Sequence, residues 1–367
     1  MTDTPTIPGP PDRTFGMKAA MDFANDPISY LQNLVDEYGD IARARFGPTF
    51  YSYTIRNPDY VRQVMISQSK KIRKWERQTE VIRKISGEGT FVSEGDFWRR
   101  QRRLIQPAFH TNRIKAYIEL MLNHAERMLT SWEGQQTVAA SYEMSKVTMG
   151  IISDILFDIK DLEKDADVLY EAINVSVEMI GAEITALMPI PDWVPTPRNR
   201  RENQAMATLD RFILELISQR RATSKDHGDV LSALLMVVDD EHDNIPMTDQ
   251  QVRDELMTLF IAGHETTAMA LTWTLYLLAR HPDVQERLYE EVHRVLSDGR
   301  LPTLADLETM TYTDQVLREA MRLYPPAWAI IVREAIEDVQ IGDYTVPAGG
   351  LIVISPWLLH HDARVFP

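Results

Sequence analysis

An acid and an alcohol stand side by side in the middle of a long apolar segment. Residues 262–267 read AGHETT. Gly263 and the β-branched pair Thr266-Thr267 are unfavourable in a helix interior, and they stand beside the carboxyl of Glu265 and the imidazole of His264. Ala262, Gly263 and Thr266 fall at i, i+1 and i+4 of a helix, which leaves that face with little side-chain volume. A flat or small ligand has room there.

Two other interpretations of this segment were weighed. The first is a kinked buried helix, in which the threonines bond back to the preceding turn and Glu265 pairs with a distant arginine. The residues alone leave this alternative open. The second is a zinc protease motif, which needs a second histidine at position 268. Ala268 stands there, so that alternative is excluded.

One long helix must carry this segment. Thr248 with Gln251 three residues later is the pattern of a capping box, and His281-Pro282 ends the helix because proline cannot continue it. The signals predict a helix over residues 248–280, about 32 residues or roughly 48 Å long. Residues 256–279 are mostly apolar on all sides, which predicts burial.

A basic helix is predicted over residues 96–104, which read DFWRRQRRL. Trp98 and Arg102 are i, i+4 and therefore point the same way. So many cations in a short segment repel one another, and some should find anions. The run is either a solvated basic face, or a clamp in which arginines bind carboxylates of a ligand.

A third candidate pair lies near the end of the chain. Glu319 and Arg322 are i, i+3 in a helix predicted over residues 314–324. Exposed pairs of this kind are common and contribute little. The apolar neighbours of this pair predict a largely buried helix instead, in which an ion pair needs further groups to complete it. We therefore expect a network around Glu319 and Arg322.

The rest of the chain supplies mostly helices and a few strands. Hydrophobic periodicity predicts helices over residues 28–38, 58–68, 114–132, 142–157, 167–187, 201–221, 229–238 and 282–296. A β-hairpin is predicted from residues 41–46 and 49–56 around Gly47-Pro48, and residues 332–354 have strand character with turns at Gly342-Asp343 and residues 348–350. The fold class is therefore mainly α with a small β part (α+β), with strands at both ends of the sequence.

Composition bounds the class of protein. The chain has 367 residues and a hydrophobic content of 44%, which is enough for a large core. Its 54 acidic and 39 basic residues give a net charge of −15, which disfavours nucleic acid as a partner. No apolar run predicts a transmembrane segment, and residues 1–13 are polar and proline-rich rather than a signal peptide. These features predict a cytoplasmic protein.

A proline-rich segment separates two of the helices. Residues 189–197 contain four prolines, which predicts a stiff, non-helical bridge. The apolar residues of this bridge fit a lid or a contact with a membrane surface, and equally an ordinary packed connector.

The order of the motifs resembles the cytochrome P-450 family of haem-thiolate monooxygenases. The resemblance is carried by Ile7-Pro8-Gly9-Pro10, Trp98-x-x-x-Arg102, Ala262-Gly263-x-Glu265-Thr266-Thr267, Glu319-x-x-Arg322 and Arg333. Each motif alone is weak, but together they cover nearly the whole chain. The resemblance implies a single catalytic domain over residues 1–367, with a long central helix over the haem.

The resemblance also implies a cofactor, heme b (iron protoporphyrin IX), and a role for each motif. Glu265 and Thr266 match the acid and alcohol that deliver protons during oxygen activation. Ala262 and Gly263 match the step that leaves room for dioxygen, Trp98, Arg102 and Arg333 match residues that hold the haem propionates, and Glu319 with Arg322 match a structural pair.

The chain departs from the family in its iron ligand. The family uses a cysteine in a glycine-containing loop beyond the Glu-x-x-Arg helix, and this sequence has no cysteine. We therefore assign no metal ligand. The sequence is interpreted as a fragment truncated before that loop, or else as a naturally shortened protein. The family fold places His360 and His361 away from the iron, so neither is expected to replace the cysteine.

The expected function is a haem-dependent monooxygenase that inserts one atom of dioxygen into a lipophilic substrate. Electrons from NAD(P)H would come through a ferredoxin, flavodoxin or reductase. The alternative is an inactive truncated form or a non-catalytic module that binds haem or a hydrophobic molecule; a purely helical scaffold is less consistent with the residues at 263–266. Five residues are candidates for a substrate pocket, each with ordinary core packing as the alternative: Phe91, Val92, Leu259, Trp328 and Ala329.

Overall fold

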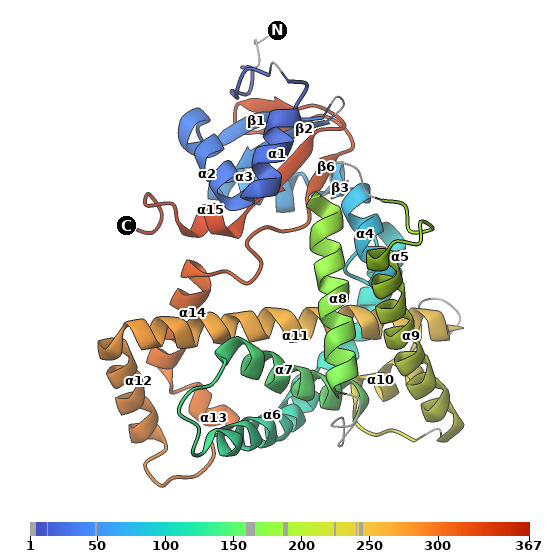
Figure 1. Ribbon diagram of the computed structural model, residues 1–367, viewed down its shortest axis with the longest axis vertical. Coiled ribbons are helices and arrows are strands. Elements are labelled where there is room, and N and C mark those ends of the chain that lie inside the picture. The colour runs from blue at the N-terminus through green and yellow to red at the C-terminus, as the bar shows by residue number, and fades with distance from the viewer. Residues whose placement is uncertain are drawn as a thin grey trace. The chain divides into compact units, whose positions relative to one another are not determined.

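The described residues of the computed structural model form two compact units. They are residues 5–12, 14–47, 50–158, 166–185, 190–223, 225–239, 241 and 245–367. Unit 1 comprises Met1–Ile82, Ile180–Pro191 and Arg322–Pro367, and unit 2 comprises Arg83–Met179 and Asp192–Met321 (Figure 1). The expectation of a single domain over residues 1–367 stays a prediction.

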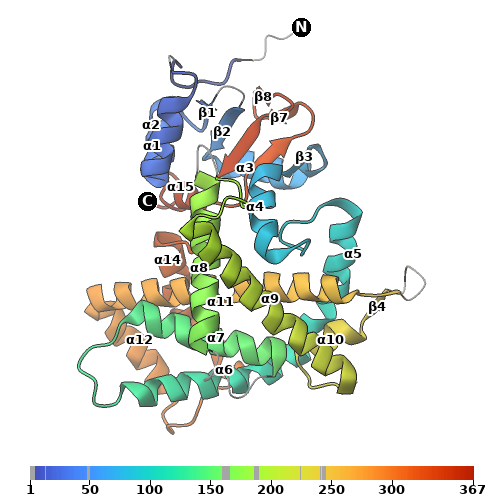
Figure 2. The ribbon, with the colours of Figure 1, turned by 45° about the vertical axis from the view of Figure 1, so that its right-hand side comes forward.

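Unit 1 contains a five-stranded mixed sheet built from both ends of the sequence (Figure 2). Its order is β1-β2-β9-β6-β3, formed by Ile41–Phe46, Phe50–Ile55, Leu351–Ile354, Arg333–Ala335 and Ile72–Lys74. The hairpin β1–β2 is antiparallel, with Ile41 opposite Ile55, as predicted. The sequence did not reveal that β9 pairs with β2 in parallel. Pro48 and Thr49, in the predicted hairpin turn, lie outside the described residues.

A second hairpin of unit 1 confirms the predicted turn at Gly342-Asp343. It joins β7 (Val339–Ile341) to β8 (Tyr344–Val346). Gly342 has φ +56°, and a Cβ there would lie 2.6 Å from the ring of Tyr60. Glycine is therefore required both by the backbone conformation and by the close approach of the ring. Alternate strand residues fill one core, which includes Ile41, Tyr53, Ile55, Val339, Ile341, Val346, Ile352 and Ile354.

Short helices pack around this sheet. Unit 1 holds α1 (Met17–Asn25), α2 (Pro27–Tyr38), α3 (Pro58–Arg62), most of α4 (Glu76–Ser86) and α15 (Pro356–His360). Asp26 caps α2 by accepting a hydrogen bond from the Ser29 amide at 3.0 Å, and Pro27 follows at the first helical position. The helix predicted over residues 58–68 is confirmed with a change of geometry, because a π-helical turn follows α3.

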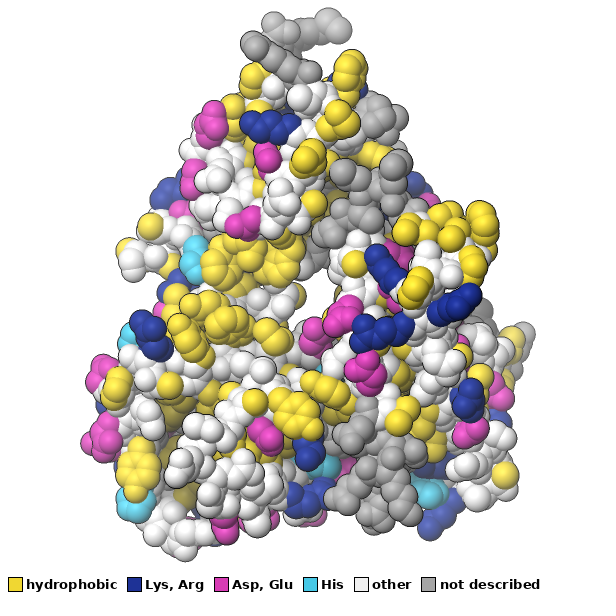
Figure 3. Space-filling view, viewed as in Figure 1, with side chains coloured by type: hydrophobic (Ala, Val, Ile, Leu, Met, Phe, Trp, Pro, Cys, Tyr) yellow, Lys and Arg dark blue, Asp and Glu magenta, His cyan; other side chains and the backbone are white. Residues whose placement is uncertain are grey.

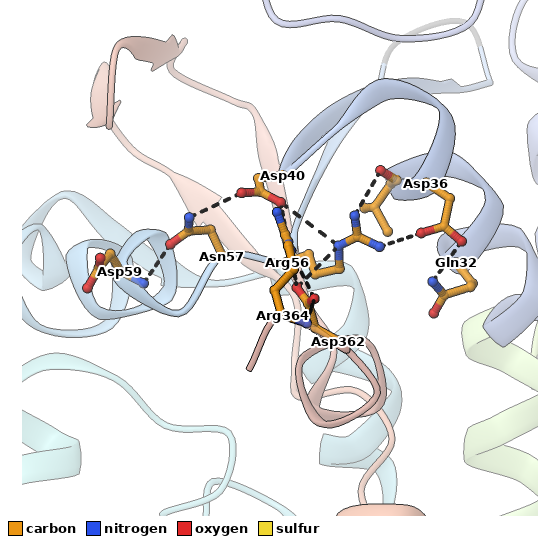
Figure 4. Close-up of polar contacts among 9 residues, drawn as sticks. Gln32, Asp36, Asp40, Arg56, Asn57, Asp59, Asp362 and Arg364 are labelled. Carbon is orange, nitrogen blue, oxygen red and sulfur yellow. Dashed lines mark hydrogen bonds and ion pairs between the residues drawn. The ribbon is translucent and has the colours of Figure 1, made fainter. Parts of the chain in front are cut away.

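A cluster of charges ties the segment after α15 to the first hairpin (Figure 4). One amino group of Arg364 donates to Asp40 at 2.6 Å and to Asp362 at 2.5 Å. Arg56 donates to Asp36, and its Nε lies 3.7 Å from Asp362. Each arginine thus lies against two or more carboxylates, and these bonds lower the pKa of Asp362 to about 2, the Arg364 hydrogen bond contributing most.

Unit 2 is helical and is organised around α11 (Asp249–Arg280). The predicted capping box is present: the Thr248 hydroxyl accepts from the Gln251 amide, and the Gln251 side chain accepts from the Thr248 amide. Both ribbon views show α7 alongside α11 (Figures 1 and 2). The other elements are α5 (Gly95–Ile105), α6 (Thr111–Trp132), α7 (Ala140–Phe157), α8 (Ala166–Thr185, whose last residues belong to unit 1), α9 (Pro197–Thr223), α10 (Val230–Met236), α12 (Pro282–Val295), α13 (Leu304–Leu307), α14 (Thr311–Leu323) and the short pair β4 (Val238–Asp239) and β5 (Ile245–Pro246).

Burial along α11 differs from the sequence prediction. All residues from Val252 to Thr258 are buried, although three of them are charged. The second half was predicted to be buried on all sides, and that prediction is wrong: Leu275 and Tyr276 are exposed. The reason is that α11 packs here along one side, where Ala268 and Leu271 meet Met144 and Val147 of α7.

The predicted fold class, mainly α with a small β part, is confirmed. The sequence missed α1, α4, α13, α15 and β3. Of two predicted elements, part lies outside the described residues: Leu187 at the end of one helix and Pro189 at the start of the proline-rich bridge. Within that bridge Trp193 is 82% exposed and Asp192 accepts from Lys84 at 2.7 Å, so its role as a lid or a connector stays a prediction.

The surface of the protein carries side chains of both charges. On the face drawn in Figure 3, acidic and basic side chains are interspersed. Within the parts of the chain that the structure describes, no helix combines the length and the apolar character that crossing a bilayer requires.

Candidate active site

The threonines of α11 bond back to their own helix. The Thr266 hydroxyl donates to the Ala262 carbonyl at 2.7 Å, and the Thr267 hydroxyl donates to the Gly263 carbonyl at 3.1 Å. This part of the kinked-helix interpretation is therefore confirmed. Ala262 and Thr266 are both exposed. The Thr266 oxygen keeps lone pairs with which it can accept a hydrogen bond from a group on this face.

Gly263 lies on a different side of α11 from Ala262 and Thr266. A Cβ on Gly263 would lie 2.8 Å from Cδ1 of Ile152, so this residue faces α7. The prediction that Gly263 shares one small-residue face with Ala262 and Thr266 is thus only partly right, because one residue step turns a helix by about 100°. Close packing against Ile152 is a sufficient structural reason for the glycine, and its role beside a cofactor stays a prediction.

Glu265 is exposed, and among the described residues no arginine pairs with it. The alternative of a distant arginine partner is therefore not what the structure contains in those residues. Burial by the surrounding protein still raises the pKa of the Glu265 carboxyl above its ordinary value. A carboxyl with a raised pKa takes up and releases protons closer to neutral pH. This property suits the proton-delivery role predicted for Glu265.

His264 lies on the opposite side of α11 from solvent. Its ring is 2% exposed and meets Tyr170 edge to face at 6.5 Å. Burial lowers the pKa of His264, which keeps the imidazole neutral. No group of three or more metal-binding side chains occurs among the residues that the structure covers.

The basic helix α5 neutralises most of its charge within the chain. Arg99 pairs with Asp96, while Arg100 and Arg103 share the buried Asp239 at 2.7 and 2.5 Å. The prediction that some of these cations find anions is confirmed, and the anions belong to the protein itself. The solvated-face alternative holds for Arg99, which is exposed, whereas Arg100 and Arg103 bind an acid of the protein rather than solvent or a ligand.

Arg102 is the exception on this helix. Its guanidinium lies 5.2 Å from the centre of the Trp98 ring, which confirms that the two side chains point the same way. Arg102 is exposed, and it contacts no carboxylate among the described residues. The structure brings Trp98 to Arg102 and Ala262 to Thr266, and it records no direct bond between these two pairs. Arg102 therefore remains available to an external carboxylate.

The helix that carries Glu319 and Arg322 is less buried than predicted. Glu319 is exposed and only Ala320 of α14 is buried, so the prediction of a largely buried helix is wrong. Apolar content alone does not tell which side of a short helix meets the core. Arg322 donates to the His360 carbonyl at 2.7 Å, and Arg333, on β6, donates to the Ile331 carbonyl at 2.8 Å. Their predicted roles remain predictions.

The five candidate pocket residues differ in exposure. Phe91 is 49% exposed, whereas Val92 beside it is fully buried, as its core-packing alternative expects. Leu259, Trp328 and Ala329 are partly buried.

Two carboxylates of α11 were missed by the sequence analysis. Asp254 accepts from the Glu88 amide at 2.9 Å, and Glu255 accepts from the Thr90 amide at 3.1 Å and from the Thr90 hydroxyl at 3.0 Å. The signal was present as three consecutive charges, Arg253 to Glu255, at the start of an apolar helix. Spacing alone could not identify the loop that these acids hold.

The comparison with known proteins identifies the family. The sequence matches the family model named Cytochrome P450 over residues 8–367. It is 36% identical to cyclooctatin synthase of Streptomyces melanosporofaciens, covering 95% of this chain and 75% of that protein. It is 35% identical to cyclooctat-9-en-7-ol 5-monooxygenase of the same organism (93% and 73%) and 31% identical to pentalenene oxygenase of Streptomyces avermitilis (93% and 74%).

The chain therefore belongs to the cytochrome P450 family. Membership implies a haem group, electrons from a redox partner and an oxidoreductase activity. The donor set is consistent with haem at the propionates, because Arg102 carries a charge that no described carboxylate neutralises. The sequence as given contains no cysteine, the residue that the resemblance implies as the iron ligand.

Proposed function

We propose that this chain is the oxygen-activating part of a haem monooxygenase that inserts one oxygen atom into a lipophilic substrate. The observation that carries the proposal is the centre of α11. There an exposed alcohol, Thr266, lies next to an acid, Glu265, whose pKa is raised by burial. When bound, haem supplies the oxidising chemistry.

The residues of the chain would then act as follows. Trp98 and Arg102 hold one propionate, and Arg333 holds another. Thr266 accepts or donates a hydrogen bond at the reacting oxygen, and Glu265 carries protons to it from solvent. Glu319 and Arg322 serve the structure rather than the chemistry. Activity also requires a thiolate ligand, which this sequence does not contain.

The substrate class and the electron source extend this proposal. Two relatives bear the names of oxygenases for pentalenene and for cyclooctat-9-en-7-ol. Among the lipophilic molecules that an apolar pocket accommodates, we therefore favour cyclic terpenes and their alcohols. Electrons would come from NAD(P)H through a separate ferredoxin, flavodoxin or reductase.

The alternative expected from the sequence, a non-catalytic module that binds haem or a hydrophobic molecule, is the second candidate. The two candidates are separated by extending the chain with a C-terminal segment that carries a cysteine in a glycine-containing loop. The first predicts a reduced carbon monoxide complex with the absorption band of thiolate ligation, and product from a cyclic terpene. A haem complex without that band and without product would favour the second.

Thr266→Ala in the extended protein tests the role of the alcohol. Among the described residues, the Thr266 hydroxyl bonds only to its own helix, so its removal should leave the contacts of α11 with other elements intact. We expect oxygen consumption to continue while the fraction recovered as product falls tenfold or more, since one positioned proton-transfer group contributes about 10²- to 10⁴-fold. Thr267→Ala is the matched control. Equal coupling in both variants would contradict the proposal.

A further inference from the structure

Glu255 holds a loop against α11 without a cation of its own. The residue is 1% exposed, and its Oε2 accepts both hydrogen bonds from Thr90. Its Oε1 is also buried and has no hydrogen-bond partner among the described residues. A carboxyl in this position is half satisfied, and an unpaired buried charge is costly when the group is ionised.

The held loop, residues 87–93, fits tightly against the helix. A Cβ on Gly87 would lie 2.1 Å from the Asp254 carboxylate, and one on Gly89 would lie 2.0 Å from the Thr258 hydroxyl. The Glu88 amide donates to Asp254. The loop backbone therefore contacts α11 directly through Asp254, Glu255 and Thr258.

The loop lies on the face of α11 that leads to the candidate active site. Glu255, Leu259, Ala262 and Thr266 are spaced i, i+4, i+7 and i+11, which places them along one line of the helix. Phe91 is the exposed large apolar side chain of the loop. Its position is thus set by the bonds that Thr90, one residue before it, makes to Glu255.

The charges around Glu255 do not neutralise it. On its own helix Asp254 is a like charge, and Arg253 is taken up by Asp254 at 3.0 Å and by Asp210 of α9. On the loop side, Glu88 pairs with Arg83 at 2.9 Å. Among the described residues, the cations named here are thus already paired with other acids, and the one charge that acts on the Glu255 carboxyl is that of the acid Asp254.

We propose that Glu255 is a positioning residue that keeps the loop of residues 87–93 closed on α11 while protonated and releases it on ionisation. The inference goes beyond the proposed function, and its test does not depend on haem or on oxygenation. Its consequence would be a substrate-contact loop, carrying Phe91, that opens as the pH rises.

The direction of the pH effect follows from the coupling between protonation of Glu255 and closure of the loop. Burial raises the pKa of Glu255 to about 7, an effect larger than the opposing hydrogen bonds from Thr90, and Asp254 adds to the rise. In an open, hydrated loop the pKa would return towards its ordinary value of 4.5. The closed state thus binds more protons than the open state between these values. Closure is favoured at low pH and weakens as the pH rises through this window.

Hydrogen exchange of the 367-residue chain tests this proposal. Protection factors of the amides of residues 88–93, corrected for intrinsic rates, should fall about tenfold between pH 6 and pH 8. In Glu255→Gln the neutral amide can still accept from Thr90, so the protection should be independent of pH. The amides of Tyr312 and Thr313, which donate to Glu291 at 2.9 and 2.7 Å, serve as the internal control and should show no such fall.

A second variant keeps the test informative if Glu255→Gln does not fold. Thr90→Val removes the hydrogen bond from the hydroxyl, and that bond stabilises the ionised carboxylate. Without it the pKa of Glu255 should rise further, so the fall in protection should move to higher pH. Protection that does not depend on pH in the unmodified chain would overturn the proposal. So would an equal fall in Glu255→Gln and the unmodified chain.

Discussion

Glu255 and Glu291 hold neighbouring backbone in nearly the same way, yet their pKa values are shifted in opposite directions. Each accepts hydrogen bonds from the amide and the hydroxyl of a threonine. Glu291 accepts a further amide bond, from Tyr312, and Arg294 lies 3.9 Å away. In the part of the chain that the structure describes, Glu255 has neither a third hydrogen bond nor a cation.

The two carboxyls differ in how deeply they are buried and in how many hydrogen bonds and cations offset that burial. Burial acts to raise the pKa of both carboxyls; at Glu291, which is covered by its neighbours but shallow, the three hydrogen bonds and Arg294 outweigh it and lower the pKa. At Glu255 burial prevails. The same local bonds therefore produce a stable cap when both carboxylate oxygens have hydrogen-bond partners, and a pH-sensitive contact when one oxygen lacks a partner.

The largest expected loss of stability follows from Asp254→Ala. This change leaves the buried guanidinium of Arg253 with only Asp210, which is partly exposed, and frees the Glu88 amide. We expect the free energy of unfolding, measured with urea, to fall by about 3 kcal/mol. Asp210→Ala is the control and should lower it by about 1 kcal/mol. Equal losses would show that Asp254 has no special place in this network.

Gly89→Ala tests how closely the loop approaches α11. The new Cβ would meet the Thr258 hydroxyl and the Asp254 carbonyl, the latter at 2.8 Å. We expect a loss of about 2 kcal/mol in the free energy of unfolding. Gly181→Ala, on α8, has nothing within 4 Å of its Cβ and should instead stabilise the protein by about 1 kcal/mol. A neutral effect of the Gly89 change would mean that the loop does not rest on Thr258.

Replacing each glutamate by glutamine should change the stability of the protein in opposite directions at pH 8. Because the pKa of Glu291 is lowered, its contribution to stability is present above the ordinary value of 4.5 and is lost as the pH falls below it. Glu291→Gln should therefore cost about 1 kcal/mol at pH 7 and nothing at low pH. Glu255→Gln should raise the melting temperature at pH 8. The same sign for both variants at pH 8 would contradict this account.

Local signals in the sequence predicted much of the fold. Thr248, Gln251 and Pro282 fixed the ends of α11, and the i, i+4 spacing of Trp98 and Arg102 predicted their contact. These features depend only on neighbours along one helix. They can be derived because helix geometry determines which residues share a face.

Contacts between distant segments could not be predicted in the same way. The parallel pairing of β2 with β9 joins Ser52 to Leu351, and no local pattern encodes it. The partner of Gly263 is Ile152, and the partner of Glu255 is Thr90. Gly263 is an unusual residue for a helix interior and Glu255 for an apolar helix, but only the tertiary structure identifies their neighbours.

We propose that this chain holds haem through Arg102, which contacts no carboxylate among the described residues. The direct test compares haem affinity of Arg102→Leu and Arg99→Leu in the extended, cysteine-bearing protein. Arg99 lies on the same helix and is already paired with Asp96. The account predicts about tenfold weaker haem binding for Arg102→Leu, because a charge-assisted bond contributes about 1.5 kcal/mol or more, and unchanged binding for Arg99→Leu. Equal affinities in the two variants would contradict it.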